Sequence, residues 1–304
     1  MEKYQRVDFR DAIAKNKRKS FFLMLTIFVV LILLGYVISM AFSEKYFFFI
    51  MIIAIIFSII YVLIGFYNSH KIAIASVGAK KVQRSEYKDY YNLVEGLTLA
   101  SGLPMPELYV MPSHQINAFA SGRNPQNAVV CVTEGALEKL DRRELEGVLA
   151  HELGHIGNYD MRYMTMVGVM VGMIAIISEI FLRSLWFSGG RGSSDNDKTK
   201  AIFMIIGILL AILAPIVVYL VQLSISRKHE YSADATAVKF TRYPQGLIGA
   251  LEKIKQDYEK PSLTNQKERK PSKALAPMFF ANPFKAMGST HPPIDRRIGK
   301  LERM

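Results

Sequence analysis

The sequence predicts an α+β, mostly α-helical integral membrane protein, with about four transmembrane helices and a small antiparallel sheet in its water-exposed part. Three observations lead to this fold class. Hydrophobic residues make up 51% of the 304 residues, they gather in long runs, and short β-type runs lie between these. Because a soluble enzyme carries fewer hydrophobic residues, we expect much of the chain to lie in a lipid bilayer.

The first two hydrophobic runs, 20–42 and 46–67, contain no charged residue and are each long enough to cross a bilayer. The first is too long for a cleavable signal peptide and lacks a small-residue cleavage site, so we expect it to remain as an anchor. Two later runs, at about 164–187 and 201–223, flank a polar Gly/Ser-rich stretch. They are predicted to be spans or membrane-embedded hairpins.

Lys and Arg residues predict the orientation of these spans. They gather before the first span, which places the N-terminus in the cytoplasm. Four spans then return both later polar segments, and the C-terminus, to the cytoplasmic side, where the two can assemble into one catalytic domain. The expected organisation is a basic N-terminus with a two-helix anchor (1–67), a sheet-containing part (68–163), a membrane hairpin (164–223) and a second catalytic part (224–304).

The formal net charge of +12 could indicate a nucleic-acid partner. The charge flanks the membrane runs, however, and no nucleic-acid-binding motif accompanies it, so attraction to anionic lipid headgroups explains it better. The single cysteine, Cys131, excludes an internal disulfide and is typical of a reducing compartment. We therefore expect the bilayer, and no nucleic acid, as a partner.

The polar segment after the second span is expected to begin with a helix at 87–99, which Gly102 ends. Three short β-type runs follow at 107–110, 116–120 and 128–132, and they predict a small antiparallel sheet. An exposed edge strand aligns an extended substrate by main-chain hydrogen bonds, which makes Asn117, Ala118 and Phe119 candidate substrate-binding residues. The alternative is that this strand is only scaffold.

A helix carrying metal-ligand spacing follows the sheet. Asp141 and Glu144 predict a capping box at its start, and an apolar face then continues into His151-Glu152-Leu153-Gly154-His155. Two imidazoles four residues apart project from one helix face and can bind one Zn²⁺, while Glu152 can take a proton from the attacking water. The pattern predicts metal-dependent peptide hydrolysis; the alternative is a helix that carries two histidines by chance.

Two histidines leave a tetrahedral zinc short of a third protein ligand. Glu230 and Asp234, four residues apart after the last hydrophobic run, are the candidates: Glu230 as ligand, and Asp234 as hydrogen-bond acceptor for a ligand histidine. His229 is a rival ligand, although it points about 100° round the helix from Glu230. The other interpretation of the pair is a solvated acidic helix face.

The C-terminal part offers one more candidate. His291 stands before Pro292-Pro293, which stiffens the entry to a terminal helix, and a rigid histidine near a metal can donate to a developing oxyanion. Packing at the helix entry is the alternative role. The stretch at about 258–288, rich in Lys, Pro and Ser, is expected to be a loop that covers the cleft or a plain linker.

These motifs resemble the HtpX-like membrane zinc metallopeptidases, which are relatives of the prenyl-protein (CAAX) endopeptidases. The resemblance covers nearly the whole chain, although Lys228-His229 stands where an Arg-rich pair is expected. It rests on four segments besides the hydrophobic runs: the strand 117–122, the motif 151–155, the segment 230–234 and the stretch 289–293.

The resemblance implies a cytoplasmic zincin-like domain with one Zn²⁺ on His151, His155 and Glu230. It implies that Glu152 is the general base and acid, and that Asp234 orients a ligand. His291 and Arg297 would stabilise the tetrahedral intermediate, with Arg296 leaving the arginine ambiguous by one, and 117–119 would align the substrate.

The implied activity is endoproteolysis of damaged or misfolded membrane proteins, from the cytoplasmic side of the bacterial inner membrane and under envelope stress. Two alternatives remain open at this point. A prenyl-protein endopeptidase shares the metal chemistry but needs a membrane chamber for a lipid, for which four spans are few. A non-catalytic scaffold would keep zinc for structure, with a fourth protein ligand such as His229 or His291.

Overall fold

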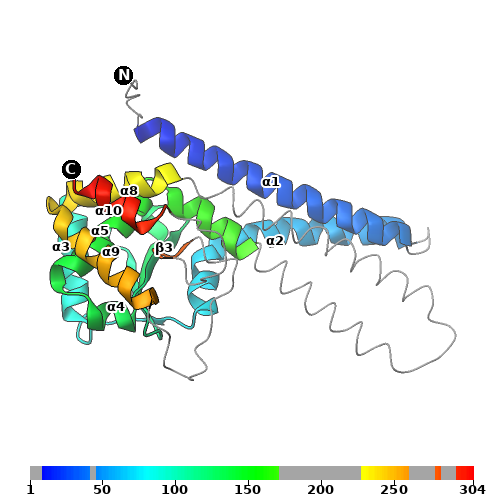
Figure 1. The fold of residues 1–304 in the computed structure, drawn as a ribbon. Helices are drawn as coiled ribbons and strands as arrows, with labels where there is room; N and C mark the ends of the chain where they lie inside the picture. The colour runs from blue at the N-terminus through cyan, green and yellow to red at the C-terminus, as the bar shows by residue number, and fades with distance from the viewer. Residues whose placement is uncertain (1–8, 42–45, 171–226, 260–277, 282–291) are drawn as a thin grey trace, which may run out of the picture.

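The computed structural model describes residues 9–41, 46–170, 227–259, 278–281 and 292–304 (Figure 1). The predicted run 201–223 and most of 164–187 lie outside the described residues, and so does His291. Within the described part the protein is mostly helical, with one small mixed sheet.

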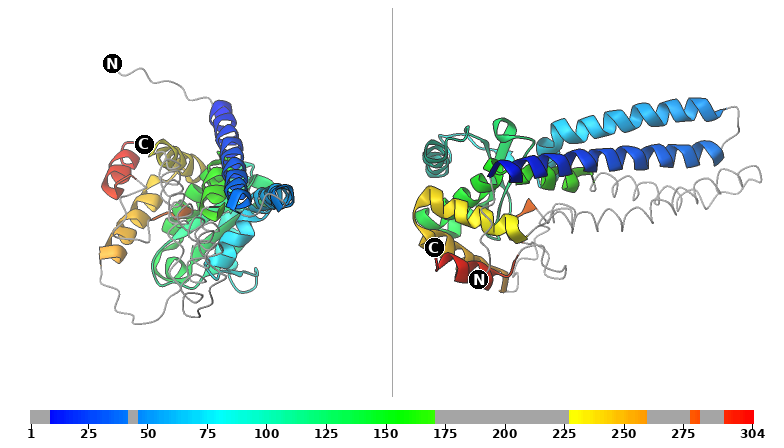
Figure 2. Two further views of the ribbon diagram at one scale, coloured as in Figure 1. Left: turned by 90° about the vertical axis from the view of Figure 1, so that its right-hand side faces the viewer. Right: turned by 90° about the horizontal axis from the view of Figure 1, so that it is seen from above.

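Two long helices, α1 (Phe9–Ala41) and α2 (Phe47–Ser76), lie side by side and project from the rest of the molecule (Figures 1 and 2). In the described ranges, α2 is the helix that is long and apolar enough to cross a membrane; its apolar window has a mean hydropathy of 3.2 and is 11% buried. Gly35 lets α1 approach Ala54 of α2 closely, as small residues do between membrane helices.

Both helices extend beyond the hydrophobic runs that predicted them. The run 20–42 corresponds to a helix that already begins at Phe9, and the run 46–67 to one that continues to Ser76. The extra turns lie at the ends that reach the compact part of the molecule (Figure 1). Hydrophobicity reports only the apolar portion of a helix, so polar turns that continue it are missed.

The sheet contains β1 (Lys80–Lys81), β2 (Glu107–Met111), β3 (Ala118–Gly122) and β4 (Ala128–Thr133), in the spatial order β1-β2-β4-β3. The prediction of a purely antiparallel sheet is wrong, because β2 and β4 are parallel. β4 lies between β3 and β2, antiparallel to its hairpin partner β3 and parallel to β2. All six residues of β4 are buried, as expected for a central strand.

The structure also describes α3 (Lys88–Ser101), α4 (Glu134–Lys139), α5 (Arg142–Gly157), α8 (Arg227–Thr241), α9 (Pro244–Glu259) and α10 (Ile294–Leu301), with a helical stretch at 160–170. The helix that was expected to stop at Gly102 does so, with that glycine in the left-handed conformation (φ 71°). α5 lies at the centre and contacts β3, α8 and α9.

The start of α5 is the predicted capping box. The Asp141 carboxylate accepts hydrogen bonds from the main-chain N–H groups of Arg143 (2.8 Å) and Glu144 (2.9 Å). The Glu144 carboxylate in turn accepts from the N–H of Asp141 at 2.7 Å. These bonds satisfy donors that a helix N-terminus leaves without partners, which fixes where α5 begins and therefore which way its histidines point.

A close approach of α8 to α5 depends on Gly154. A Cβ at this position would lie 3.2 Å from the Cβ of Thr236 and 3.3 Å from the carbonyl oxygen of Ala233. Because a glycine stands there, α8 can pack directly against the helix face that carries the two histidines. The core around this crossing includes Leu149, Leu153, Ile156, Ala237, Leu251 and Ile254, all of them buried.

Candidate metal centre

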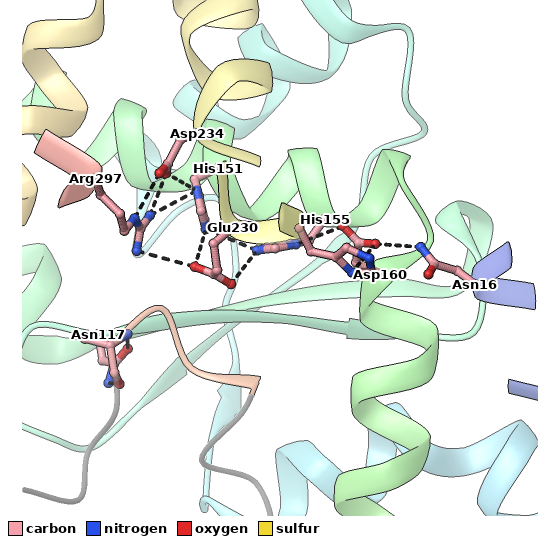
Figure 3. A network of polar contacts seen from close by, with 10 residues as sticks. Asn16, Asn117, His151, His155, Asp160, Glu230, Asp234 and Arg297 are labelled. Carbon is pink, nitrogen blue, oxygen red and sulfur yellow. Dashed lines mark hydrogen bonds and ion pairs between the residues drawn. The ribbon is translucent and has the colours of Figure 1, made fainter. Parts of the chain in front are cut away.

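Three buried side chains from two helices converge at the centre of the molecule (Figure 3). His151 and His155 lie one turn apart on α5, and their Nε2 atoms are 3.1 Å apart. Glu230, in the first turn of α8, places its carboxylate oxygens 3.8 Å from the His151 Nε2 and 3.5 Å from the His155 Nε2. Two imidazoles and one carboxylate form a donor group that can hold a metal ion.

This donor group fits a zinc ion in both chemistry and size. Zinc binds imidazole nitrogen and carboxylate oxygen at about 2.0–2.2 Å, and tetrahedral angles then separate neighbouring donors by roughly 3.3–3.5 Å. The three separations observed here, 3.1, 3.5 and 3.8 Å, bracket that range. With three protein donors, one tetrahedral position remains for water or substrate, which is the arrangement of catalytic rather than structural zinc sites.

His151 is oriented from its other ring nitrogen. Its Nδ1 lies 2.9 Å from the Oδ1 of Asp234, one turn beyond Glu230 on α8. A hydrogen bond from Nδ1–H to a carboxylate leaves the lone pair of Nε2 directed at the metal position. Burial, followed by the nearby Arg297 charge, lowers the pKa of His151 to about 4, so this imidazole is neutral and able to donate its lone pair.

Arg297 of α10 joins the two carboxylates of α8. Its guanidinium donates to both oxygens of Asp234, at 2.6 and 3.0 Å, and its Nη1 lies 3.5 Å from the Glu230 Oε2. Its side chain is 1% exposed and lies over the Phe280 ring, whereas Arg296 is exposed. Of the two candidate arginines, the structure therefore places Arg297 at the metal centre.

His155 is oriented by a residue that sequence reasoning missed. Its Nδ1 lies 3.4 Å from the Oδ2 of Asp160, which begins the helical stretch 160–170 and is 3% exposed. The other oxygen of Asp160 lies 3.0 Å from the Nδ1 of His229. His229, the rival ligand, thus faces this carboxylate. The only signal in the sequence is an acidic residue five positions after a ligand histidine. An acidic residue on the surface could have the same spacing.

The electrostatics of the pair His155 and Asp160 differ from those of the pair His151 and Asp234. Burial would raise the pKa of Asp160, but the hydrogen bonds from His155 and His229 lower it to about 2. Burial alone would lower the pKa of His155, yet hydrogen bonds to Asp160 and Glu230 raise it well above its usual range. The two carboxylates therefore favour the charged form of His155, and a bound cation competes with that proton.

Glu152 lies beside the donor group and is 2% exposed. Desolvation by burial raises its pKa to about 7, and a main-chain hydrogen bond from Ala120 of β3 opposes that rise. Glu152 and the three metal donors line one cavity, whose other walls are Ala120, Met161, Met164 and the segment Met278–Phe280. A carboxylate with a pKa near neutrality in such a cavity is suited to moving protons.

The strand predicted to align a substrate does lie at a sheet edge, but part of that edge is already paired. The Phe280 N–H donates to the Ala118 carbonyl at 2.8 Å, and Phe279 lies opposite Phe119 with ring centroids 5.2 Å apart. Main-chain groups of alternate residues point to the same side of a strand, so Ala120 also faces this outer edge.

Asn117 points away from the metal donors and holds the segment 278–281 in place (Figure 3). Its Nδ2 donates to the Ala281 carbonyl at 2.8 Å, and its Oδ1 accepts from the Ala281 N–H at 3.1 Å. The side-chain amide thereby replaces the main-chain pairing that a neighbouring strand would supply. A third bond, from Nδ2 to the Tyr258 hydroxyl, measures 2.8 Å.

Asn117→Ala is expected to lower the free energy of unfolding by about 1–3 kcal/mol, because main-chain groups of Ala281 lose their partners. Tyr258→Phe removes only the hydroxyl and should cost about 1 kcal/mol or less. Chemical denaturation of both variants in the same detergent gives the comparison. Equal losses in the two variants would show that the Ala281 pairing contributes nothing.

A helix with the HExxH motif, a third metal donor from a later helix and a strand at the sheet edge beside them define a metalloprotease. The sequence pattern of peptidase family M48 matches residues 85–304. The chain belongs to peptidase family M48.

Individual relatives extend the similarity over almost the full length. A protein named Protease HtpX homolog from Dictyoglomus thermophilum is 39% identical over 300 residues, covering 97% of this chain and 95% of that protein. One from Thermoanaerobacter pseudethanolicus is 40% identical over 296 residues, 96% of each chain. A crystal structure of S. mikatae Ste24p is similar at 19% identity and a TM-score of 0.48, covering 96% of this chain and 67% of that one.

Proposed function

We propose that this protein is a membrane-bound, zinc-dependent endopeptidase that cleaves misfolded or damaged membrane proteins from the cytoplasmic side of the bacterial inner membrane. The observation that carries the proposal is the buried His151, His155 and Glu230 group with Glu152 in the same cavity. Membership of a peptidase family agrees with it.

The residues of this chain divide the chemistry between them. His151, His155 and Glu230 would hold the zinc ion, which when bound polarises the peptide carbonyl and lowers the pKa of water. Glu152 takes a proton from the attacking water and returns it to the leaving amine. Arg297 keeps the carboxylates of Asp234 and Glu230 in place and is the cation nearest the site within the described ranges. His291 is proposed to assist the oxyanion.

Helices α1 and α2 support the proposed membrane location and orientation of the protein. Large apolar side chains of both helices, such as Phe22, Phe48 and Ile56, are exposed to an extent that water does not favour. The basic N-terminus favours a cytoplasmic location for the compact part, by the positive-inside rule. An active site in that part would reach the cytoplasmic segments of membrane proteins.

For the substrate, we propose an extended segment that pairs with the outer edge of β3 near Ala120. This edge borders the cavity, and the chain's own segment 278–281 already pairs antiparallel with it, Phe279 lying opposite Phe119 and the Phe280 N–H donating to the Ala118 carbonyl. Asn117 and Phe119 hold the segment 278–281 against this edge. Misfolded proteins supply such segments because they expose main-chain groups that a native fold hides.

The experiment is purification in detergent with a chelator, followed by zinc add-back with an unfolded casein-like protein as substrate. We expect no cleavage with the chelator and recovery after zinc is added. Hydrolysis that persists in saturating chelator would exclude the proposal. Mass mapping of fragments, including self-cleavage products, would define the sequence preference.

The same preparation separates the alternatives. A prenyl-protein endopeptidase would cleave a farnesylated peptide and leave its unmodified counterpart intact, whereas we expect both to be cut. A scaffold with structural zinc would place a fourth protein ligand on the metal. The orientation of His229 toward Asp160 argues against that residue in such a role.

A further inference from the structure

The membrane helix α1 reaches the metal centre through one buried amide. Asn16, in the second turn of α1, is 2% exposed. Its Nδ2 donates to the Oδ1 of Asp160 at 2.6 Å and to the main-chain carbonyl of Asn158 at 3.2 Å (Figure 3). The same Asp160 carboxylate holds His155, so the Asn16 amide and the Asp160 carboxylate connect α1 to a metal donor.

The lengths of these contacts show which is most sensitive. Asp160 receives Asn16 at 2.6 Å, His229 at 3.0 Å and His155 at 3.4 Å. The contact to His155 is the longest and depends on the carboxylate staying where its other two partners hold it. Without the Asn16 amide, Asp160 would be free to turn toward His229, and His155 would lose the acceptor that sets its tautomer and ring orientation.

We propose that Asn16 is a positioning residue of the metal centre, acting through Asp160 on His155, so that the first membrane helix forms part of the metal site. Burying an amide costs free energy unless it is hydrogen-bonded, and both donations of Asn16 go to the loop and helix that follow the metal-binding helix. The inference rests on the zinc site proposed above, but it does not depend on peptide hydrolysis.

The test measures zinc affinity of the full-length protein in detergent by competition with a chelating indicator. Asp160→Asn is expected to weaken zinc binding about 10- to 100-fold, and Asn16→Leu, which keeps the side-chain volume, about 3- to 10-fold. The double variant should bind zinc no more than two-fold more weakly than Asp160→Asn alone, because both residues act on one contact. Cobalt substitution should show an altered visible absorption in each variant.

Ser20→Ala is the matched control. Ser20 lies one turn further along α1, is fully buried, and donates to the Asn16 carbonyl within its own helix. Its zinc affinity and cobalt spectrum should stay within two-fold of the unchanged protein, even where its melting temperature falls. If Asn16→Leu does not fold, Asn16→Ala takes its place and is expected to show the same weakening of zinc binding, about 3- to 10-fold.

Unchanged zinc affinity and an unchanged cobalt spectrum in the Asn16 variants, with a lower melting temperature of the metal-free protein, would reduce Asn16 to a structural role and overturn the inference. If the unchanged protein itself binds no zinc, the proposed function fails instead. Because neither measurement uses a substrate, lack of peptidase activity affects neither outcome.

Discussion

Glu152→Gln is expected to bind zinc with unchanged affinity and to cleave an unfolded protein about 10²- to 10⁴-fold more slowly than the unchanged protein. Glutamine keeps the shape of the side chain and its place beside the Ala120 N–H, but it cannot accept a proton. The three metal donors are untouched. The expected effect therefore falls mainly on kcat.

The measurement is casein-like substrate cleavage at saturating zinc, together with the metal content of the purified protein. Glu146→Gln is a suitable control, because this residue lies on the same helix and outside the cavity lining. Full activity of Glu152→Gln would exclude Glu152 as the proton-transfer group. Loss of zinc in that variant would show that the carboxylate supports the metal rather than the proton transfer.

Arg297→Met is expected to lower the free energy of unfolding of the metal-free protein by about 3–5 kcal/mol, as happens when one partner of a buried ion pair is removed. The carboxylates of Asp234 and Glu230 would remain buried without the guanidinium that bonds one and lies 3.5 Å from the other. Methionine fills a similar volume, so the loss reports charge and hydrogen bonding more than packing. α10, which carries Arg297, should detach first.

Arg296→Met is the matched control for this prediction. It is the same substitution one residue earlier in α10, at an exposed position, and should change stability by less than about 0.5 kcal/mol. Chemical denaturation of both variants in one detergent decides between them. Equal stabilities would mean that the buried arginine contributes nothing net, with its desolvation cost offsetting its two ion pairs.

Much of the local structure could be predicted because its causes lie within a few residues of one another. The spacing of His151 and His155 places both imidazoles on one helix face whatever surrounds the helix. Asp141 and Glu144 set the start of that helix by local hydrogen bonds, as the structure confirms. The terminal helix after Pro293 follows from the fixed backbone of proline.

Other features of the candidate site depend on contacts between distant segments. Nothing near Asp160 in the sequence distinguishes it from a surface acid, and Asn16 stands 144 positions before it. The choice between Arg296 and Arg297 depended on which face of α10 is buried. The sheet order depended on where β4 inserts, because hydrogen-bonding partners of a strand are not encoded in its own alternation.

By itself the sequence determined the metal-binding chemistry, the first two apolar helices and the family to which the chain belongs. Periodicity and donor spacing are properties of single helices, and they survive in any fold. Only the tertiary structure decided which buried polar group meets which: Arg297 with Asp234, Asp160 with His155, and Asn16 of α1 with Asp160. Such pairings arise from helix packing, which brings together side chains that the chain itself keeps far apart.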